Sequence, residues 1–167
     1  MSVTIRGSGQ VPVQVQTTTL TTATFSTTST SMTDLTGVTV NITPTNSSNK
    51  VLVTVNITYA FQSNYNAAFN LLRNGTPVGI GTSGTTGPNY SFIASPAGTN
   101  TPSNCSFQFL DSPATTSAVT YKIQVRLQGG SGGTFALNYA NTYLNASTEV
   151  YNGSYVSTIT AQEIAYA

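Results

Sequence analysis

Apolar and polar residues alternate with a period of two along most of this 167-residue chain, which limits its possible folds more than any other feature. The clearest runs extend from Val51 to Tyr59, from Val119 to Leu127 and from Val38 to Ile42. Successive side chains of a strand point to opposite faces, so this alternation predicts half-buried antiparallel strands with one wet face. Val and Thr favour the same conformation through their branched Cβ atoms.

Turn-forming residues separate these runs. Asn74-Gly75 is the strongest short hairpin signal, and Pro44 to Asn49, Ser112-Pro113 and Gly129 to Gly133 mark further reversals. No run of ten residues has helical periodicity. We therefore expect about ten strands. Their expected positions are residues 13–25, 35–43, 50–61, 67–73, 77–81, 90–94, 105–111, 117–128, 134–140 and 154–165.

This number of strands and this chain length predict an all-β fold, a single-domain antiparallel sandwich of the jelly-roll type. The domain is expected to cover residues 13–167. The Gly-rich residues 1–12 are expected to form an extended N-terminal arm that docks on a neighbour. No fixed internal repeat is present, which argues against a solenoid or a propeller.

Ionisable side chains are scarce: five Lys and Arg, four Asp and Glu, and no His. The net charge is +1 and the basic residues never cluster, so neither nucleic acid nor a membrane surface is an expected partner. His supplies most proton transfer near neutral pH, so its absence favours contact over catalysis. By residue type, only Cys105 and the amino terminus could titrate between pH 6 and 8, so the free energy of unfolding should be nearly constant there.

Two further features concern location and redox state. The first ten residues lack the apolar core of a secretory signal, and no stretch approaches the roughly 20 apolar residues of a membrane-spanning helix. Cys105 is alone, and we interpret it as a small buried hydrophobe beside Phe107 and Phe109.

A hydrolytic pair of carboxylates could come only from Asp34, Asp111, Glu149 and Glu163. Asp34 and Asp111 lie next to turns, where Asp commonly caps backbone amides, so we interpret both as structural. The sequence predicts no catalytic residues, but a polysaccharide-degrading enzyme remains the alternative.

Other kinds of chemistry find little support. A Ser–Lys nucleophile would need Lys50, which opens a strand, or Lys122, which lies on the wet face of one. A metal site of His or Cys ligands is excluded by count, and no cofactor is expected. A calcium site of carbonyl oxygens and one carboxylate stays open.

The segment from Asn138 to Tyr155 is rich in Tyr, Asn, Ser and Gly, which build adaptable binding surfaces. A ring stacked on a sugar, with amides beside it, would make a glycan contact. In the alternative, which we favour, the tyrosines anchor a loop or pack at a subunit boundary. The candidate receptor or glycan contacts are Tyr139, Asn141, Tyr143, Asn145, Tyr151 and Tyr155.

Several runs, taken in order, resemble short structural proteins of tailed bacteriophages, described as tail-fibre or virion-surface proteins. These runs are Val13 to Thr19, Thr24 to Ser29, Asp34 to Pro44, Ser48 to Val55, Phe69 to Val78 and Gln162 to Ala165. The resemblance covers nearly the whole chain. It implies a jelly roll similar to the tumour-necrosis-factor and complement globular-head type, which usually forms trimers.

The resemblance therefore leads us to expect a homotrimer. The final strand, Tyr155 to Ala165, has apolar residues on both faces, which suits a strand covered by its own domain and by neighbours. Ile159 and Glu163 would then lie at the trimer axis, where three like charges need water, a cation or a proton.

The expected function is that of a non-enzymatic structural protein on the surface of a bacteriophage virion. Two positions compete: the receptor-contacting head of a tail fibre, and a capsid decoration (cement) protein. The expected partners are two further copies of the chain, other capsid or tail proteins, and a host surface glycan. A secreted carbohydrate-binding adhesin is a further alternative.

Overall fold

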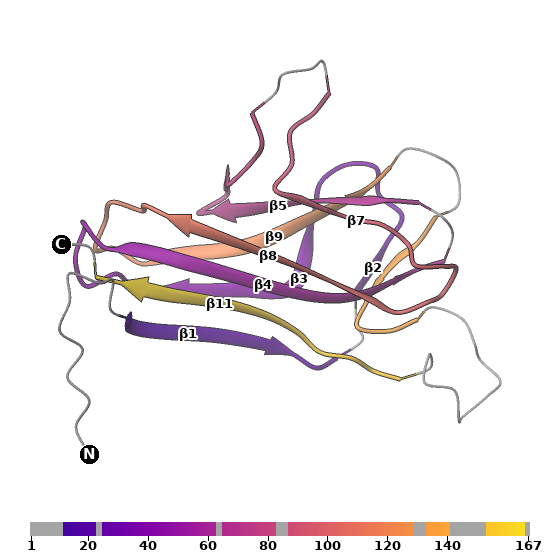
Figure 1. Cartoon of the computed structure of the whole chain (residues 1–167), viewed down its shortest axis with the longest axis horizontal. Helices are drawn as coiled ribbons and strands as arrows, with labels where there is room; N and C mark the ends of the chain where they lie inside the picture. The colour runs from indigo at the N-terminus through magenta and orange to yellow at the C-terminus, as the bar shows by residue number, and fades with distance from the viewer. Residues whose placement is uncertain are drawn as a thin grey trace.

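Two antiparallel β-sheets packed face to face form the described part of the chain (Figure 1). The structure is a computed structural model that describes residues 12–22, 25–62, 65–82, 87–128, 133–140 and 153–165. Eleven strands and no helix lie within these ranges. The predicted all-β sandwich is confirmed.

Sheet A contains β1 (Pro12–Leu20), β2 (Phe25–Thr27), β4 (Lys50–Phe61), β8 (Ser103–Asp111), β10 (Phe135–Leu137) and β11 (Ser157–Ile164). Sheet B contains β3 (Thr33–Ile42), β5 (Ala67–Arg73), β6 (Thr76–Val78), β7 (Phe92–Ala94) and β9 (Val119–Leu127). In sheet A, β4 is central, with β8 on one side and β11 followed by β10 on the other. In sheet B, β9 and β5 are central.

The strands pair in a nested order. β1 pairs with β11, β3 with β9, β4 with β8, and β5 with β6 and β7. The chain therefore follows the path of one long hairpin rolled into a sandwich, which is the topology of a jelly roll. The tip of this hairpin is Asn74-Gly75, where φ is 48° and 86°. Positive φ at both residues defines a type I′ turn, so the predicted hairpin is confirmed.

The predicted alternation places one face of each long strand in the core. Val51, Val53, Val55 and Ile57 of β4 are fully buried, and the residues between them are partly exposed. The odd-numbered residues of β9 are buried in the same way. Burial of one such side chain contributes about 1.5–3 kcal/mol, so the core stabilises this register over a slip by one residue.

β3 keeps its apolar residues in the core through an irregularity in its pairing. The register with β9 shifts between Asp34 and Thr39, where β3 has more residues than its partner. Because of this bulge, Leu35 and Val38 both face the core although they are three residues apart. Strict alternation predicts opposite faces for this pair.

Aromatic rings join the two sheets. Phe69 of sheet B stacks on Phe92 at a centroid distance of 4.7 Å, and Phe92 stacks on Phe107 of sheet A at 5.0 Å. Phe69 also meets Phe135 of sheet A edge to face at 5.8 Å. Such pairs add roughly 0.5–1.5 kcal/mol each beyond their buried area, so this cluster stabilises the contact between the sheets.

One predicted strand is two separate strands. The run expected at residues 13–25 divides into β1 and β2, because β1 pairs with β11 only as far as Leu20, opposite Ser157. β2 pairs instead with β10, which continues the line of β11 along β4. The arm expected at residues 1–12 lies outside the described residues, except that Pro12 is the first residue of β1.

The close packing of the sheets predicts opposite outcomes for two glycine substitutions. A Cβ atom on Gly79 would lie 2.8 Å from the ring of Phe109, whereas one on Gly75 would meet nothing within 4 Å. Both residues have positive φ, so Ala strains the backbone at each by roughly 1–2 kcal/mol. We expect Gly79→Ala to cost about 1–3 kcal/mol more than Gly75→Ala, through overpacking. Chemical denaturation measures this difference, and equal losses for the two variants would contradict it.

Candidate functional site

Two acidic residues lie in one row of sheet A and face the interior at the same end of the sandwich. Glu163 of β11 and Asp111 of β8 are both paired with Val51 of β4, which lies between them. Glu163 is fully buried, and Asp111 is 5% exposed. A buried carboxylate is tolerated where hydrogen bonds or a counter-charge replace its water.

Glu163 is stabilised by hydrogen bonds from uncharged groups. Its Oε1 atom accepts bonds from the Thr45 amide at 2.7 Å, the Thr45 hydroxyl at 2.8 Å and Asn49 Nδ2 at 2.6 Å. Its Oε2 atom accepts a bond of 2.6 Å from Gln14 Nε2. Burial raises the pKa of Glu163, but the hydrogen bonds from Asn49, Gln14 and Thr45 outweigh this and hold the pKa at about 2.

The expected place of Ile159 and Glu163 at a trimer axis is wrong for both side chains. Each has no exposed surface within a single chain, so neither can contact a symmetry mate. Strict alternation in β11 turns both inward and leaves Thr158, Thr160 and Gln162 on the outer face. The apparent second apolar face came from Val156, which precedes the strand and is 49% exposed, and from Ile164, which is buried at the end of the strand.

Asp111 and Asp34 form ion pairs and do not cap turns, which corrects the sequence interpretation. Asp111 of sheet A accepts bonds of 2.9 and 3.0 Å from Arg73 Nη1 and 2.6 Å from the Tyr121 hydroxyl, both from sheet B. Burial and the Asp111 carboxylate raise the pKa of Tyr121. Asp34 accepts bonds of 2.6 Å from Lys122 Nζ and 2.8 Å from Gln124 Nε2, and these lower its pKa.

Cys105 packs as predicted. Its side chain is partly buried against the core with Phe107 and Phe109, which follow it at alternate positions of β8. Burial raises the pKa of the thiol to about 12, so Cys105 does not titrate between pH 6 and 8.

The tyrosine-rich segment has a fixed base. Asn138 is fully buried, with positive φ, and its Nδ2 atom donates to the Leu20 carbonyl at 2.8 Å. Its Oδ1 atom accepts a bond of 2.6 Å from Ser157 Oγ. Tyr139 then pairs with Ser154, and the Tyr155 amide donates to the Asn138 carbonyl at 2.9 Å.

Two of the six candidate contacts in this segment can be placed. Tyr139 and Tyr155 are partly buried at the base. Asn141, Tyr143, Asn145 and Tyr151 lie outside the described residues. The glycan contact and the anchoring role therefore both stay predictions.

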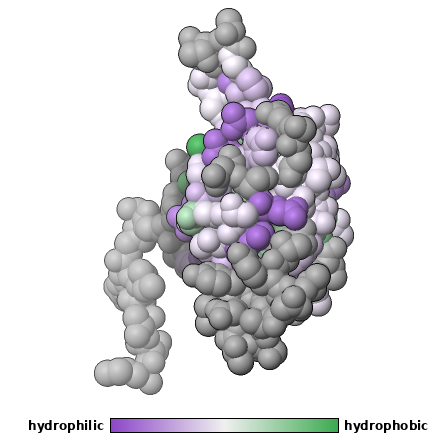
Figure 2. Space-filling view, turned by 90° about the vertical axis from the view of Figure 1, so that its right-hand side faces the viewer, coloured by the Kyte–Doolittle hydropathy of each residue, from purple (hydrophilic) through white to green (hydrophobic). Residues whose placement is uncertain are grey.

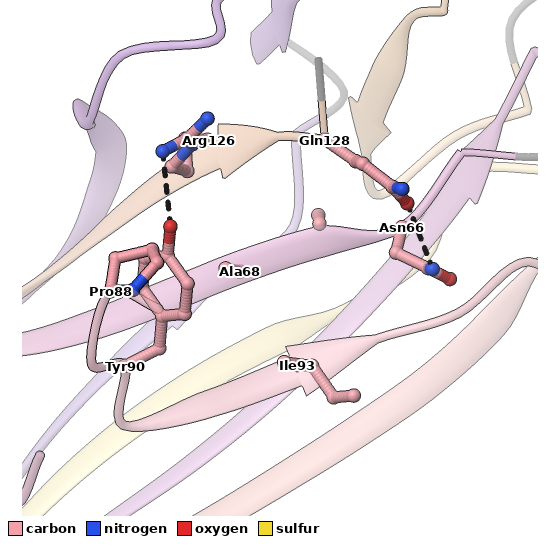
Figure 3. A pocket seen from close by; sticks show the side chains of 8 residues that line it. Asn66, Ala68, Pro88, Tyr90, Ile93, Arg126 and Gln128 are labelled. Carbon is pink, nitrogen blue, oxygen red and sulfur yellow. Dashed lines mark hydrogen bonds between the residues drawn. The ribbon is translucent and has the colours of Figure 1, made fainter. Parts of the chain in front are cut away.

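A separate hollow of about 290 Å³ lies on the outer face of sheet B, and the sequence analysis did not predict it (Figure 3). Its floor is one row of the sheet, in which Arg126 of β9 and Ile93 of β7 both pair with Ala68 of β5. A small side chain between two large ones leaves this space. Ile93 is 63% exposed.

Hydrogen-bonded pairs of polar side chains form two sides of the hollow (Figure 3). On one side, Arg126 Nη1 donates to the Tyr90 hydroxyl at 3.0 Å, and Arg126 Nε donates to the Leu127 carbonyl at 3.4 Å. On the other side, Asn66 Nδ2 donates to Gln128 Oε1 at 3.1 Å. The described residues supply no carboxylate to pair with Arg126.

Ser91 fixes the position of Tyr90. The Ser91 hydroxyl accepts a bond of 3.0 Å from the Leu71 amide and donates to the Val78 carbonyl at 3.2 Å. The Ser91 amide donates to the Phe69 carbonyl at 2.9 Å. These bonds join the residue after Tyr90 to β5 and β6, so the phenol ring is held over the sheet by its neighbour's backbone.

The sequence analysis missed the hollow because cross-strand pairing creates it. Ala68 and Arg126 are 58 positions apart in the chain and meet only through the register of β5 and β9. The available signal was an arginine on the wet face of a strand. Whether an acidic side chain lies beside such an arginine depends on which strands pair with β9 and in which register.

Figure 2 shows one end of the sandwich, coloured by hydropathy. Its described surface is pale or purple, with only small green areas, as expected for a chain rich in Ser, Thr and Asn. No three His, Cys, Asp or Glu side chains of the described ranges form a group that could hold a metal ion. Among those same residues, no helix is long and apolar enough to cross a membrane.

Comparison with known proteins gives a distant likeness in fold. No protein-family model matches the chain, and no curated protein matches it. Among solved structures, it is similar to a chain in "Structure of infectious bursal disease virus Gx strain", with 14% identity and a TM-score of 0.38. The match covers 92% of this chain and 42% of that one, so this chain spans less than half of its length. No function is transferred from it.

The buried Glu163 predicts how stability depends on pH. The folded pKa of about 2 lies below the usual value of 4.5, so the stabilisation is complete above pH 4.5 and is lost as the pH falls towards 2. We expect a nearly constant free energy of unfolding between pH 6 and 8, and a loss of about 2–3 kcal/mol from this group below pH 4.5. Urea denaturation at each pH measures both.

Two variants distinguish the contribution of Glu163 to pH-dependent stability from that of an exposed carboxylate. Glu163→Gln should destabilise the protein at pH 7 and should remove most of the loss on acidification. Asp34→Asn is the control, because the Asp34 side chain is 52% exposed and its ion pair contributes little. If Glu163→Gln and the native protein lose the same stability between pH 5 and 3, the assignment to Glu163 is wrong.

Proposed function

We propose that this chain is a non-enzymatic structural protein on the surface of a bacteriophage virion, either the head of a tail fibre or a capsid decoration protein. The observation that carries this proposal is that the outer face of sheet A is broad and that Lys50, at its margin, is its one charged side chain among the described residues. The resemblance of the sequence runs to short phage proteins supplies the phage context.

The outer face of sheet A is continuous across four strands. One row consists of Val15, Gln162, Leu52 and Leu110, and the next consists of Thr17, Thr160, Thr54 and Gln108. Hydroxyls and amides join neighbouring strands, as in the 3.0 Å contact between Thr17 and Thr160. Lys50 lies only at the margin of the face, at the start of β4.

The outer face of sheet B has a different character. It contains Asp34 and Lys122 as an ion pair, and Arg126 beside the hollow. A surface without charge presents neither long-range repulsion nor a strong desolvation cost to a similar protein surface. The contrast supports packing against other virion proteins through sheet A, with sheet B turned to solvent.

The carboxylates of the described residues have structural partners, which supports a role without catalysis. Glu163 is surrounded by amides and hydroxyls, Asp111 is paired with Arg73, and Asp34 is paired with Lys122. A hydrolytic pair needs two carboxyl groups that reach the substrate, whereas Glu163 and Asp111 are buried. A reducing-sugar assay on capsule of the host tests the enzyme alternative.

We propose a homotrimer in which the outer face of sheet A contributes to the contact between copies. Light scattering should give three times the chain mass of 17.4 kDa. Leu110→Lys, at a position 43% exposed on this face, should dissociate the assembly, because a desolvated unpaired charge costs several kcal/mol. Ile80→Lys is the control, because Ile80 is 42% exposed elsewhere. A native mass of 17.4 kDa at micromolar concentration would refute the trimer.

Electron microscopy of intact particles tests the proposed location. Antibodies raised against the purified protein, coupled to gold, should label particles of the phage that encodes it. Label at the fibre tips identifies a tail-fibre head, and label over the capsid identifies a decoration protein. Particles without label, and without the protein by mass spectrometry of purified virions, would overturn the proposal. An antibody against an unrelated jelly-roll protein provides the control.

A further inference from the structure

We infer that the hollow on the outer face of sheet B binds one acidic sugar residue, a hexuronic acid, of a surface polysaccharide. This inference rests on the proposed function for the biological source of the ligand. The chemistry of the site comes from the side chains around Ala68.

Arg126 supplies an unneutralised positive charge. A guanidinium group has five N–H donors, and two of those on Arg126 bond to the neutral oxygens of Tyr90 and Leu127. The remaining three have no partner among the described residues. By contrast, Arg73 and Lys122 are each paired with an aspartate. A guanidinium group in a hollow pairs most favourably with a carboxylate, through two parallel hydrogen bonds.

The other polar groups suit hydroxyls. The Tyr90 hydroxyl accepts its bond from Arg126, so its own hydrogen is available to a ligand oxygen. The Asn66–Gln128 pair uses one donor and one acceptor, which leaves Gln128 Nε2 to donate and Asn66 Oδ1 to accept. Adjacent donors and acceptors of this kind bind the neighbouring hydroxyls of a sugar ring.

The floor and the size of the hollow suit a single ring. Ala68 and Ile93 provide an apolar surface for the C–H face of a pyranose, and Pro88 lies beside Tyr90 (Figure 3). The volume of about 290 Å³ lies just below the range for small-molecule sites, roughly 300–1,000 Å³, so one sugar residue is the expected unit. A phosphate dianion would call for a second cation, and Arg126 is the only charged residue among those that line the hollow.

The binding test uses the purified protein and methyl β-D-glucuronide, with methyl β-D-glucoside as the neutral control. Titration followed by ¹H–¹⁵N NMR should shift the amides of Ala68, Tyr90 and Arg126 with the glucuronide. The glucoside should bind at least about tenfold more weakly, a difference of about 1.4 kcal/mol. Sulfate, added alone, should bind more weakly than the glucuronide, because it lacks the apolar face.

Three variants assign the binding to the hollow. Arg126→Gln removes the charge and Ala68→Leu fills the space without changing the charge, so each should weaken glucuronide binding by about tenfold or more. Lys122→Gln is the matched control, because it removes the same charge from the same face of β9, and its affinity should stay within about twofold. The dispersion of the NMR spectrum checks that each variant folds. If Arg126→Gln unfolds, Arg126→Lys replaces it, and the loss of the planar fork should still weaken binding.

The outcomes separate this inference from the proposed function. No shift with the glucuronide, equal binding of the glucoside or of sulfate, or unchanged affinity in Arg126→Gln and Ala68→Leu would each overturn the inference. Glucuronide binding by a protein that is absent from phage particles would overturn the proposed function and leave the sugar site intact. Phage particles that carry the label, together with a purified protein that does not bind the glucuronide, would overturn the inference and leave the proposed function intact.

Discussion

The register of β4 is the constraint on which most of the structure depends. This strand pairs along its length with β8 on one side and with β11 and β10 on the other, and its alternate side chains are completely buried. A slip by one residue would turn Val51, Val53 and Val55 to solvent and would break both ladders at once. The same register places Glu163 and Asp111 on either side of Val51.

Three of the charged side chains that the structure describes, Glu163, Asp111 and Arg73, lie inside or between the sheets. The Glu163 carboxylate joins β1, β11 and the connection from β3 to β4 through amide and hydroxyl donors. The Arg73–Asp111 pair, with the Tyr121 hydroxyl, joins sheet B to sheet A. Removing one partner from such a buried group leaves an unsatisfied charge, so these contacts favour one arrangement of the sandwich over others.

The two outer faces divide the surface into parts of different chemistry. Sheet A presents hydroxyls, amides and a few aliphatic side chains, whereas sheet B presents an ion pair and the Arg126 hollow. This asymmetry is the physical basis of both proposals, which assign contact with neighbouring subunits to sheet A and sugar binding to sheet B. The base of the tyrosine-rich segment is fixed by Asn138 and Ser157, so it is anchored independently of both faces.

The sequence by itself determined the fold class, the Asn74-Gly75 hairpin and the inward face of nearly every long strand, because alternation and turn chemistry are local. Sequence patterns predicted the wrong role where residues far apart in the chain determine a side chain's contacts. They merged β1 and β2 into one strand, placed Glu163 at an axis, and gave Asp34 and Asp111 to turns. Partners such as Gln14 of Glu163, Lys122 of Asp34 and Arg73 of Asp111 are 38 to 149 positions away in the chain. Only the tertiary structure could place Ala68 between Arg126 and Ile93, because these three residues come from strands that are distant in the chain. The hollow exists because the small side chain of Ala68 lies between the two larger ones in the paired strands.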